Sequence, residues 1–465
     1  MPDSLLLRAL ARSFLAGEPI VEQLVARGAR ALGQPWRWLR PLAQRYVNAF
    51  GGRTRPRQRD VVRFFLSDLG LKRARAKYFH ALSVEHWLAV PQQMQPVDTA
   101  RAWDIPAIES ASALAEWLGL NPNQLRWFAD LKGIGYNKDR PKLGHYHYRI
   151  LAKSYGNIRL IEAPKLRLKE LQRQILARIL EKIPAHAAVH GFVKGRSIKT
   201  FVAPHVGRGA VLRMDLQDFF PAFRAARIHG FFRTLGYPES VAELLGGICT
   251  NATPRDAWKE ANADVDPLRL SAARILYARP HLPQGAPTSP ALANLCTYRV
   301  DCRLSGLAIS DGAEYTRYAD DLAFSGGEDF ARHIDRFSTH VAALLIEEGF
   351  SVHFRKTRVM RQGVRQHLAG IVINKHPNVI RADFDRLKAT LTNCARLGPE
   401  GQNRDGSPDF RAQLEGRVSF VEMKSEQRKA VARVTRANPV AIAVPVFEHH
   451  AVKGCAVTSA ARYSL

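Results

Sequence analysis

The stretch EYTRYADDLAFS, from Glu314 to Ser325, decides the fold class of this chain. Apolar and polar residues alternate on both sides of a four-residue turn, a pattern that predicts a β-hairpin. Asp320 and Asp321 lie at the predicted tip. An Asp pair in a turn is by itself most often solvent-exposed, because Asp favours turns for its side-chain hydrogen bonds. A site therefore needs support from elsewhere in the chain.

A further acidic residue is predicted at the end of a strand. Residues 210–216 form a short apolar run that includes Asp215 and Leu216, and helices follow to about Leu245. A strand end and a turn can bring carboxylates into one small volume, and carboxylates are the oxygen ligands that Mg²⁺ requires. Two divalent ions about 3.5 to 4 Å apart can activate a hydroxyl and neutralise a leaving pyrophosphate. We predict Asp215 and Asp320 as bridging ligands of two Mg²⁺ ions, which Mn²⁺ can replace, with Asp321 and the Leu216 carbonyl as additional oxygens.

Composition favours a nucleic-acid partner. The 465 residues carry 69 Lys and Arg against 42 Asp and Glu, a formal charge of +27, and 46% are hydrophobic, enough for a substantial core. Solvated basic faces are the alternative explanation of this charge. No apolar run approaches the roughly 20 residues of a membrane span. The five cysteines show no zinc-type spacing. We expect a cytoplasmic protein without a membrane partner.

The chain divides into segments of different character. The first 80 residues carry sixteen Lys and Arg against five Asp and Glu, a surplus of eleven, with the densest cluster from Arg53 to Arg63. Helices are expected there, followed by a Pro- and Gln-rich linker. Residues 146–164 predict a hairpin, residues 251–280 an irregular loop, and residues 368–374 a strand. The remainder from Asp383 to about Arg436 is basic and predicted to be helical.

Seven blocks of sequence resemble those of reverse transcriptases, in the order in which that family carries them. The resemblance extends over roughly residues 145 to 435, and chance agreement of all seven blocks is negligible. The blocks are YGNIRLIEAPKLRLKELQRQIL (155–176), HGFVKGRSI (190–198), RMDLQDFFPAF (213–223), LPQGAPTSPALANL (282–295), YTRYADDLAFSGG (315–327), GFSVHFRKTRVM (349–360) and HLAGIVIN (367–374).

The resemblance implies an α+β right-hand polymerase that acts as an RNA-directed DNA polymerase on deoxynucleoside triphosphates. Its palm would contain an antiparallel sheet and its thumb would be helical. The expected boundaries are a basic helical N-terminal extension over 1–120, fingers over 121–210, a palm over 211–375 with a fingers or loop insertion around 225–280, a thumb over 376–440, and a C-terminal tail of unknown role over 441–465.

The resemblance also implies roles for single residues. Asp215, Asp320 and Asp321 match the family's metal-binding triad. Phe220 matches the aromatic residue that excludes a 2′ hydroxyl, with a core position, at about one in three, as the alternative. Phe219 is expected to pack. The other matched residues are Gln284 in the nucleotide site, Lys153 and Arg159 as fingers residues that hold the triphosphate, Lys356 as the proton donor to pyrophosphate, and Arg196, Arg417 and Lys424 as template contacts.

Among reverse transcriptases, the chain looks most like the bacterial retron enzymes. The resemblance then implies copying of a structured noncoding RNA into branched, RNA-linked single-stranded DNA (msDNA), in antiphage defence with an effector protein. The chain departs from the retron pattern at Leu368-Ala369-Gly370, where Val-Thr-Gly is typical, and after Asn251-Ala252, where a histidine is missing. The alternatives are a group II intron, diversity-generating or abortive-infection reverse transcriptase, or a non-catalytic RNA-binding scaffold with the same fold.

Overall fold

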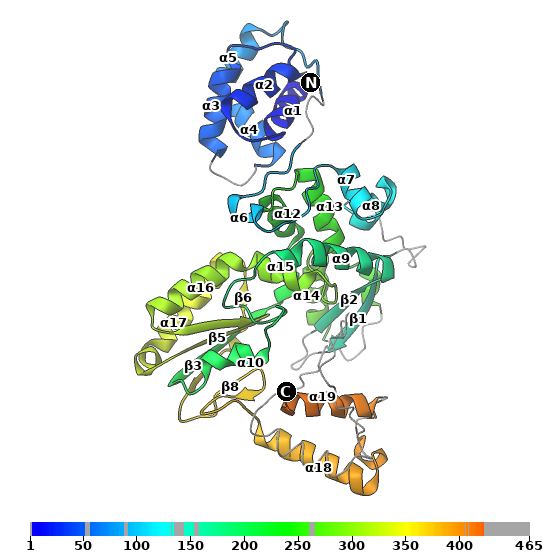
Figure 1. Cartoon of the computed structure of the whole chain (residues 1–465), viewed down its shortest axis with the longest axis vertical. Coiled ribbons are helices and arrows are strands. Elements are labelled where there is room, and N and C mark those ends of the chain that lie inside the picture. The colour runs from blue at the N-terminus through cyan, green and yellow to red at the C-terminus, as the bar shows by residue number, and fades with distance from the viewer. Residues whose placement is uncertain are drawn as a thin grey trace. The chain divides into compact units, whose positions relative to one another are not determined.

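The computed structural model describes residues 2–51, 56–87, 92–131, 133, 144–152, 158–259, 266–404, 406–407 and 409–422. The chain forms two compact units, and each is assembled from two separate stretches of sequence. Both units contain helices together with antiparallel strands (Figure 1), which confirms the mixed α and β class. Unit 1 comprises Met1–Ala185 and Phe220–Thr297, and unit 2 comprises His186–Phe219 and Tyr298–Leu465.

Unit 1 begins with five helices that surround their own apolar core, as the sequence predicted for the first 80 residues. The ring of Phe14 meets the rings of Tyr46 and Phe65 edge to face, at centroid distances of 5.2 and 5.3 Å. Asp68 caps the fifth helix by accepting a hydrogen bond from the Leu71 amide. The five helices are α1 (Pro2–Leu15), α2 (Val21–Ala31), α3 (Leu39–Phe50), α4 (Gln58–Ser67) and α5 (Leu69–Lys77).

The rest of unit 1 contains the predicted hairpin and a set of helices. The hairpin strands pair from Tyr146 opposite Pro164 to Ala152 opposite Ile158. Its predicted tip, residues 155–157, lies outside the described residues. The bounds are α6 (Asp98–Arg101), α7 (Ala111–Trp117), α8 (Pro122–Ala129), β1 (Tyr146–Ala152), β2 (Ile158–Pro164), α9 (Leu166–Arg178), η3 (Leu180–Lys182), α12 (Ala225–Thr234), α13 (Glu239–Cys249), η5 (Arg255–Trp258), α14 (Pro267–Tyr277) and α15 (Ser289–Cys296).

The expectation of an irregular loop over residues 251–280 was wrong. This segment contains η5 and the eleven-residue helix α14. The side chain of Asp266 caps α14 by accepting from the Leu268 amide, and Pro267 occupies the first helical position, where its missing N–H costs nothing. Trp258 and Tyr277 are both buried, with ring centroids 5.8 Å apart. The segment therefore adds to the core of unit 1.

Unit 2 is organised around an antiparallel sheet. Its strand order is β4-β5-β3-β6, and β7 also pairs with β3. The hairpin predicted at Glu314–Ser325 is confirmed, although its turn is shorter than expected, because Tyr318 already pairs with Asp321. The bounds are β3 (Ala210–Gln217), β4 (Glu314–Tyr318), β5 (Asp321–Gly326), β6 (Ser351–Val352) and β7 (Arg358–Arg361).

Helix α17 covers one face of this sheet. Phe337 on the helix meets Phe324 on β5 edge to face at 5.1 Å, and Phe324 stacks on Tyr315 of β4 at 4.8 Å. The opposite face carries another apolar cluster, which includes Val211 and Ala323. Because side chains alternate along a strand, residues 211, 213 and 215 share this second face with 321 and 323. The helices are α10 (Ile198–Val202), η4 (Ala203–His205), α16 (Tyr298–Ser310), α17 (Glu328–Glu347) and η6 (Phe354–Lys356).

The C-terminal part of unit 2 differs from one expectation. A single strand was predicted over 368–374, but this stretch instead contributes two very short strands to a three-stranded sheet of order β10-β9-β8. The helical character predicted after Asp383 is confirmed for the described residues, and Leu414 is buried. The bounds are β8 (His367–Leu368), β9 (Ile371–Val372), β10 (Asn378–Val379), α18 (Arg381–Leu397), η7 (Glu400–Gln402) and α19 (Phe410–Glu422).

Two predictions about the whole chain concern cysteines and membranes. Four of the five cysteines, Cys249, Cys296, Cys302 and Cys394, are free thiols, and Cys455 lies outside the described residues. Within the described ranges, none of the helices combines the length and the apolar character needed to cross a membrane.

Candidate active site

The sheet of unit 2 brings the three predicted carboxylates together. Asp215 on β3 is the register partner of Asp321 on β5, and Asp320 occupies the turn immediately before Asp321. Register partners in an antiparallel pair lie on one face of the sheet, with Cβ atoms about 4.5 to 5.5 Å apart. Asp215 is buried, whereas Asp320 and Asp321 are partly exposed. Residues more than 100 positions apart therefore meet at one end of the sheet.

Backbone contacts fix the turn that carries Asp320. Ala319 has a φ of 55°, a left-handed conformation that costs a non-glycine residue about 1 kcal/mol or more. The carbonyl of Asp320 accepts a hydrogen bond of 2.9 Å from the amide of Leu216. Gly191 lies so close that an added Cβ would be 2.7 Å from the Ala319 nitrogen. A side chain at Gly191 would consequently displace the turn.

Two cations pair with these carboxylates. Lys356 Nζ lies 3.0 and 3.2 Å from the two carboxylate oxygens of Asp215. Arg213 donates to Asp321 through Nε at 3.0 Å and through Nη2 at 2.9 and 3.0 Å. Sequence reasoning had placed Lys356 at the site but had missed Arg213. Arg213 could have been found, because residues two apart on a strand share a face and Asp215 lies two positions later.

Burial raises the pKa values of the carboxyl groups in the turn. Burial, followed by the negative charges of Asp321 and Asp215, raises the pKa of Asp320 to about 6. Burial also raises the pKa of Asp321, although Arg213 opposes this shift. Carboxylates that repel one another in this way favour binding of a cation.

The oxygen atoms at this site are the type of ligand that a hard divalent ion prefers. Three carboxylates and the nearby backbone are the all-oxygen ligands that Mg²⁺ prefers. Within the described ranges, however, no group of three or more His, Cys, Asp or Glu side chains is arranged to hold a metal ion. Asp215 and Asp321 pair with Lys356 and Arg213 instead. Binding of an ion by all three carboxylates would thus require these pairs to loosen.

Of the two adjacent phenylalanines, Phe219 packs as expected. It is 4% exposed, and its ring stacks on that of Phe350, with centroids 6.3 Å apart and an interplanar angle of 29°. Phe220, which belongs to unit 1, is partly exposed. This partial exposure is compatible with the predicted contact with a nucleotide sugar.

Gln284 lies in unit 1 on a loop that is held by Glu162 of β2. The carbonyl of Gln284 accepts a hydrogen bond of 2.8 Å from the amide of Glu162. Gly285 has a φ of 131°, and a Cβ there would be 2.9 Å from the Glu162 carbonyl oxygen. Glycine at position 285 therefore allows the backbone of this loop to approach β2 closely.

A buried polar cluster, which sequence reasoning missed, fixes Glu162. Both Glu162 and His281 are fully buried, and His281 Nε2 lies 2.9 Å from Glu162 Oε2. Asn251 Nδ2 and Thr253 Oγ1 donate to Glu162 Oε1 at 2.8 and 2.7 Å. The cluster joins β2 to the segment that leads into the Gln284 loop. No local sequence signal could have revealed it, because its members are far apart in the chain.

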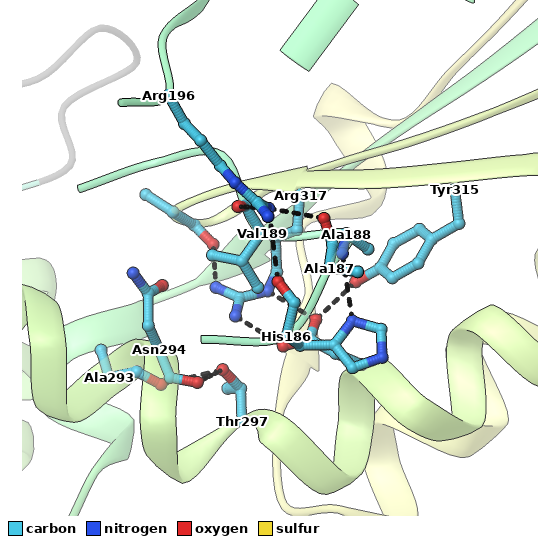
Figure 2. Close-up of polar contacts among 12 residues, drawn as sticks. His186, Ala187, Ala188, Val189, Arg196, Ala293, Asn294, Thr297, Tyr315 and Arg317 are labelled. Atoms are coloured by element: carbon cyan, nitrogen blue, oxygen red, sulfur yellow. Dashed lines mark hydrogen bonds and ion pairs between the residues drawn. The ribbon is translucent and has the colours of Figure 1, made fainter. Parts of the chain in front are cut away.

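The remaining predicted contacts are located as follows. Arg159 is exposed on β2, whereas Lys153 and Lys424 lie outside the described residues. Arg417 is partly exposed on α19. Arg196 turns inward, and its Nη1 donates to the carbonyls of Ala187 and Val189 at 2.5 Å each (Figure 2). Arg196 thus holds its own loop together, a contact that the prediction of template binding did not include.

Comparison with known proteins identifies the family. The family model described as "Reverse transcriptase (RNA-dependent DNA polymerase)" matches residues 150–380. The Retron Mx65 reverse transcriptase of Myxococcus xanthus is 38% identical over 336 residues, which cover 71% of this chain and 72% of that protein. The Retron Mx162 reverse transcriptase of the same organism is 36% identical over 369 residues, covering 76% and 72%.

More distant relatives agree. The Retron Ec86 reverse transcriptase of Escherichia coli is 32% identical over 235 residues, which cover 50% of this chain and 64% of that protein. Among solved structures, telomerase from Candida albicans aligns with 63% of this chain and 56% of its own at 12% identity, but its TM-score of 0.31 is too low to support an argument. The chain belongs to the reverse transcriptases, specifically to the retron type, and is an RNA-directed DNA polymerase.

Proposed function

We propose that the chain copies part of a structured noncoding RNA into RNA-linked single-stranded DNA (msDNA), with Asp215, Asp320 and Asp321 as the catalytic carboxylates. The observation that carries this proposal is the register pairing of Asp215 with Asp321, beside the turn that bears Asp320. The similarity to two retron reverse transcriptases of Myxococcus xanthus supports the retron assignment. In this proposal the unit 2 sheet is the palm of the polymerase.

In this proposal the residues of unit 2 have different roles in the reaction. Two Mg²⁺ ions, when bound, would make the 3′ hydroxyl nucleophilic and neutralise the leaving pyrophosphate. Asp215 and Asp320 would hold both ions, with Asp321 and the Leu216 carbonyl as further oxygen donors. Lys356 pairs with Asp215. On metal binding, its ammonium group would leave Asp215 and donate a proton to the pyrophosphate. Arg213 would keep the Asp321 carboxylate oriented.

Specificity for deoxynucleotides is assigned to unit 1. Phe220 would exclude the 2′ hydroxyl of a ribonucleotide, Gln284 would line the nucleotide site, and Arg159 with Lys153 would hold the triphosphate. These assignments depend on the match of each residue to the family's sequence blocks. The exposure of Arg159 and the partial exposure of Phe220 and Gln284 are compatible with such contacts.

We also assign an RNA contact to helix α5 at the N-terminus. The helix carries Lys72, Arg73, Arg75 and Lys77 and no acidic residue, and Phe79, two residues after its end, is 63% exposed. Basic side chains next to an exposed aromatic ring suit a phosphate backbone with unstacked bases. Replacing Lys72, Arg73 and Lys77 together by Gln should lower the salt slope of RNA binding by roughly 2 to 3. The matched control replaces Arg8, Arg12 and Arg30, and an equal change in both triple variants would refute the assignment.

The retron assignment is tested by the nucleic acid that the protein makes. The native chain, expressed with the DNA that flanks its gene, should copurify with a DNA joined to RNA, and sequencing should map both parts to that flanking DNA. RNase treatment should release the DNA with a short RNA remnant. Copurified DNA that maps to a repeat-copied variable gene or to an intron would refute the retron function. The proposed role in antiphage defence, through an effector protein, is tested by phage plaque counts with and without the Asp320→Asn change.

A further inference from the structure

Arg317 is the largest fully buried side chain among the described residues, and it lies two residues before the Ala319–Asp320 turn. Its Nε and Nη2 donate to the two carboxylate oxygens of Asp301 on α16, at 2.8 and 2.7 Å. Asp301 is fully buried and also accepts a hydrogen bond of 2.8 Å from the hydroxyl of Tyr315. Burial alone would lower the pKa of Arg317, but Asp301 raises it above its ordinary value, so the guanidinium keeps its positive charge.

The third nitrogen of the guanidinium reaches the turn itself. Arg317 Nη1 donates to the carbonyl of Ala319 at 3.1 Å. Ala319 is the residue with the left-handed backbone, and its carbonyl belongs to the peptide bond that leads into Asp320. The hydrogen bond therefore holds the peptide whose orientation sets the direction of the Asp320 side chain.

The backbone of Arg317 is held by a neighbouring segment. Its amide donates to the carbonyl of Ala188, and its carbonyl accepts from the amide of His190, both at 2.8 Å. Arg196 in turn binds the carbonyls of this segment, as Figure 2 shows. The same segment continues into Gly191, which packs against the Ala319 nitrogen. The turn is thus supported by a side chain from one side and by backbone from the other.

We infer that Arg317, oriented by Asp301, is a positioning residue that holds the Ala319–Asp320 turn in the conformation required for catalysis. This inference rests on the proposed role of Asp320. Three donors in one rigid plane can bind a carboxylate twice and still reach a carbonyl, whereas a lysine ammonium presents a single point charge. The buried pair is therefore more than a generic contact between α16 and β4.

The first test is Arg317→Lys, which keeps the charge opposite Asp301 but loses the planar fork. We expect kcat for primer extension to fall by about 10- to 100-fold, with the KM for deoxynucleotides within about threefold of the native value. Mn²⁺ binding, followed by electron paramagnetic resonance, should weaken by about tenfold. Native kcat and native Mn²⁺ affinity in this variant would overturn the inference.

A second variant separates positioning from stability. Changing Tyr315→Phe, Asp301→Leu and Arg317→Met together replaces the three polar side chains of this cluster by apolar ones, and such replacement is often neutral or stabilising. We expect a folded protein with a Tm near the native value and a kcat lowered by about 100-fold. A folded triple variant with native kcat would also overturn the inference.

The matched control is Glu348→Gln. Glu348 is a buried carboxylate that pairs with Arg299 and Arg303, which lie on the same helix as Asp301. This variant should lower the Tm and keep kcat. An equal loss of kcat in Glu348→Gln would assign the Arg317 effect to stability alone and refute positioning.

The Asp320→Asn variant distinguishes failure of the proposed catalytic site from failure of the positioning role of Arg317. Native activity in Asp320→Asn would refute the proposed site itself. An inactive Asp320→Asn together with a fully active Arg317→Lys would refute only the positioning inference.

Discussion

Lys356 and Asp215 form an ion pair in which the ammonium lies 3.0 and 3.2 Å from the two carboxylate oxygens. The Lys356 side chain is 47% exposed, while that of Asp215 is only 9% exposed. The lysine thus covers a buried carboxylate from the solvent side. It can leave that position without opening the core.

This arrangement predicts the effect of Lys356→Met. The variant should lose about 100-fold in kcat, because it lacks the ammonium that would donate a proton to pyrophosphate. Single-turnover primer extension with saturating deoxynucleotide measures this rate. The control is Lys375→Met, since Lys375 is exposed outside the carboxylate cluster and should keep the native rate. A native rate of primer extension in Lys356→Met would show that Lys356 does not donate the proton.

Gly285 should not accept a side chain. In Gly285→Ala the new Cβ would lie 2.9 Å from the Glu162 carbonyl oxygen, at a φ that L-residues rarely adopt. We expect kcat/KM for deoxynucleotides to fall at least about tenfold, because the Gln284 loop must shift. Steady-state kinetics with varied deoxynucleotide measures this. Gly306→Ala on α16, where a Cβ meets no other atom within 4 Å, should leave kcat/KM unchanged.

Substitutions of Phe219 and of Phe220 should have different effects on stability and on nucleotide selectivity. Phe220→Ala should let ribonucleotides compete about 10- to 100-fold better, because the predicted steric barrier to the 2′ hydroxyl is gone. Phe219→Leu should instead reduce stability and leave the selectivity intact, because Phe219 is buried against Phe350. The ratio of kcat/KM for deoxynucleotides to kcat/KM for ribonucleotides measures this selectivity. Loss of this selectivity in Phe219→Leu but not in Phe220→Ala would assign exclusion of the 2′ hydroxyl to Phe219 and contradict the role of Phe220.

Acid should weaken the hairpin through His205. Its Nε2 lies 2.7 Å from Thr316 Oγ1 on β4, and its Nδ1 lies 2.6 Å from Ser325 Oγ on β5. The Thr316 hydroxyl donates to the Phe201 carbonyl, so Nε2 carries the proton and donates to Thr316, and Nδ1 accepts from Ser325. Burial, followed by the charges of Arg208 and His190, lowers the pKa of His205 to about 3.

The sign of the effect follows from linkage. The unfolded chain protonates His205 near pH 6.5 and the folded protein does not, so stability is lost as the pH falls below 6.5. From pH 7 to pH 5 the loss is about 2 kcal/mol, measurable by hydrogen exchange of the β4 and β5 amides. His205→Gln, which cannot titrate, should show a flatter pH dependence. Equal dependence in both proteins would contradict this account of His205.

Much of the site could be predicted because its signals are local. The alternation around Tyr318 and the apolar run before Asp215 each depend on the period of two along a strand. These two signals correctly gave the hairpin and the strand that carry the carboxylates. The same period would have placed Arg213 beside Asp215. The helix α14 was missed although Asp266 and Pro267 are a recognisable helix start.

Other features depend on tertiary packing and leave no local pattern. Asp301 meets Arg317 only because α16 packs near β4, and Glu162 meets His281 across 119 positions. The retron pattern expects a histidine after Asn251-Ala252. In this chain His281 lies opposite Asn251 in an isolated β-bridge and shares Glu162 with it. This arrangement of Asn251, Glu162 and His281 becomes visible only when the chain is folded.

The central claim, that Asp320 and Asp321 are catalytic, is tested most directly by primer extension on an RNA template with Mg²⁺ and deoxynucleotides. The native chain should extend the primer, and the double variant Asp320→Asn, Asp321→Asn should lose at least about 1000-fold in rate while keeping its circular dichroism spectrum. Extension by the double variant at the native rate would contradict the assignment of the active site.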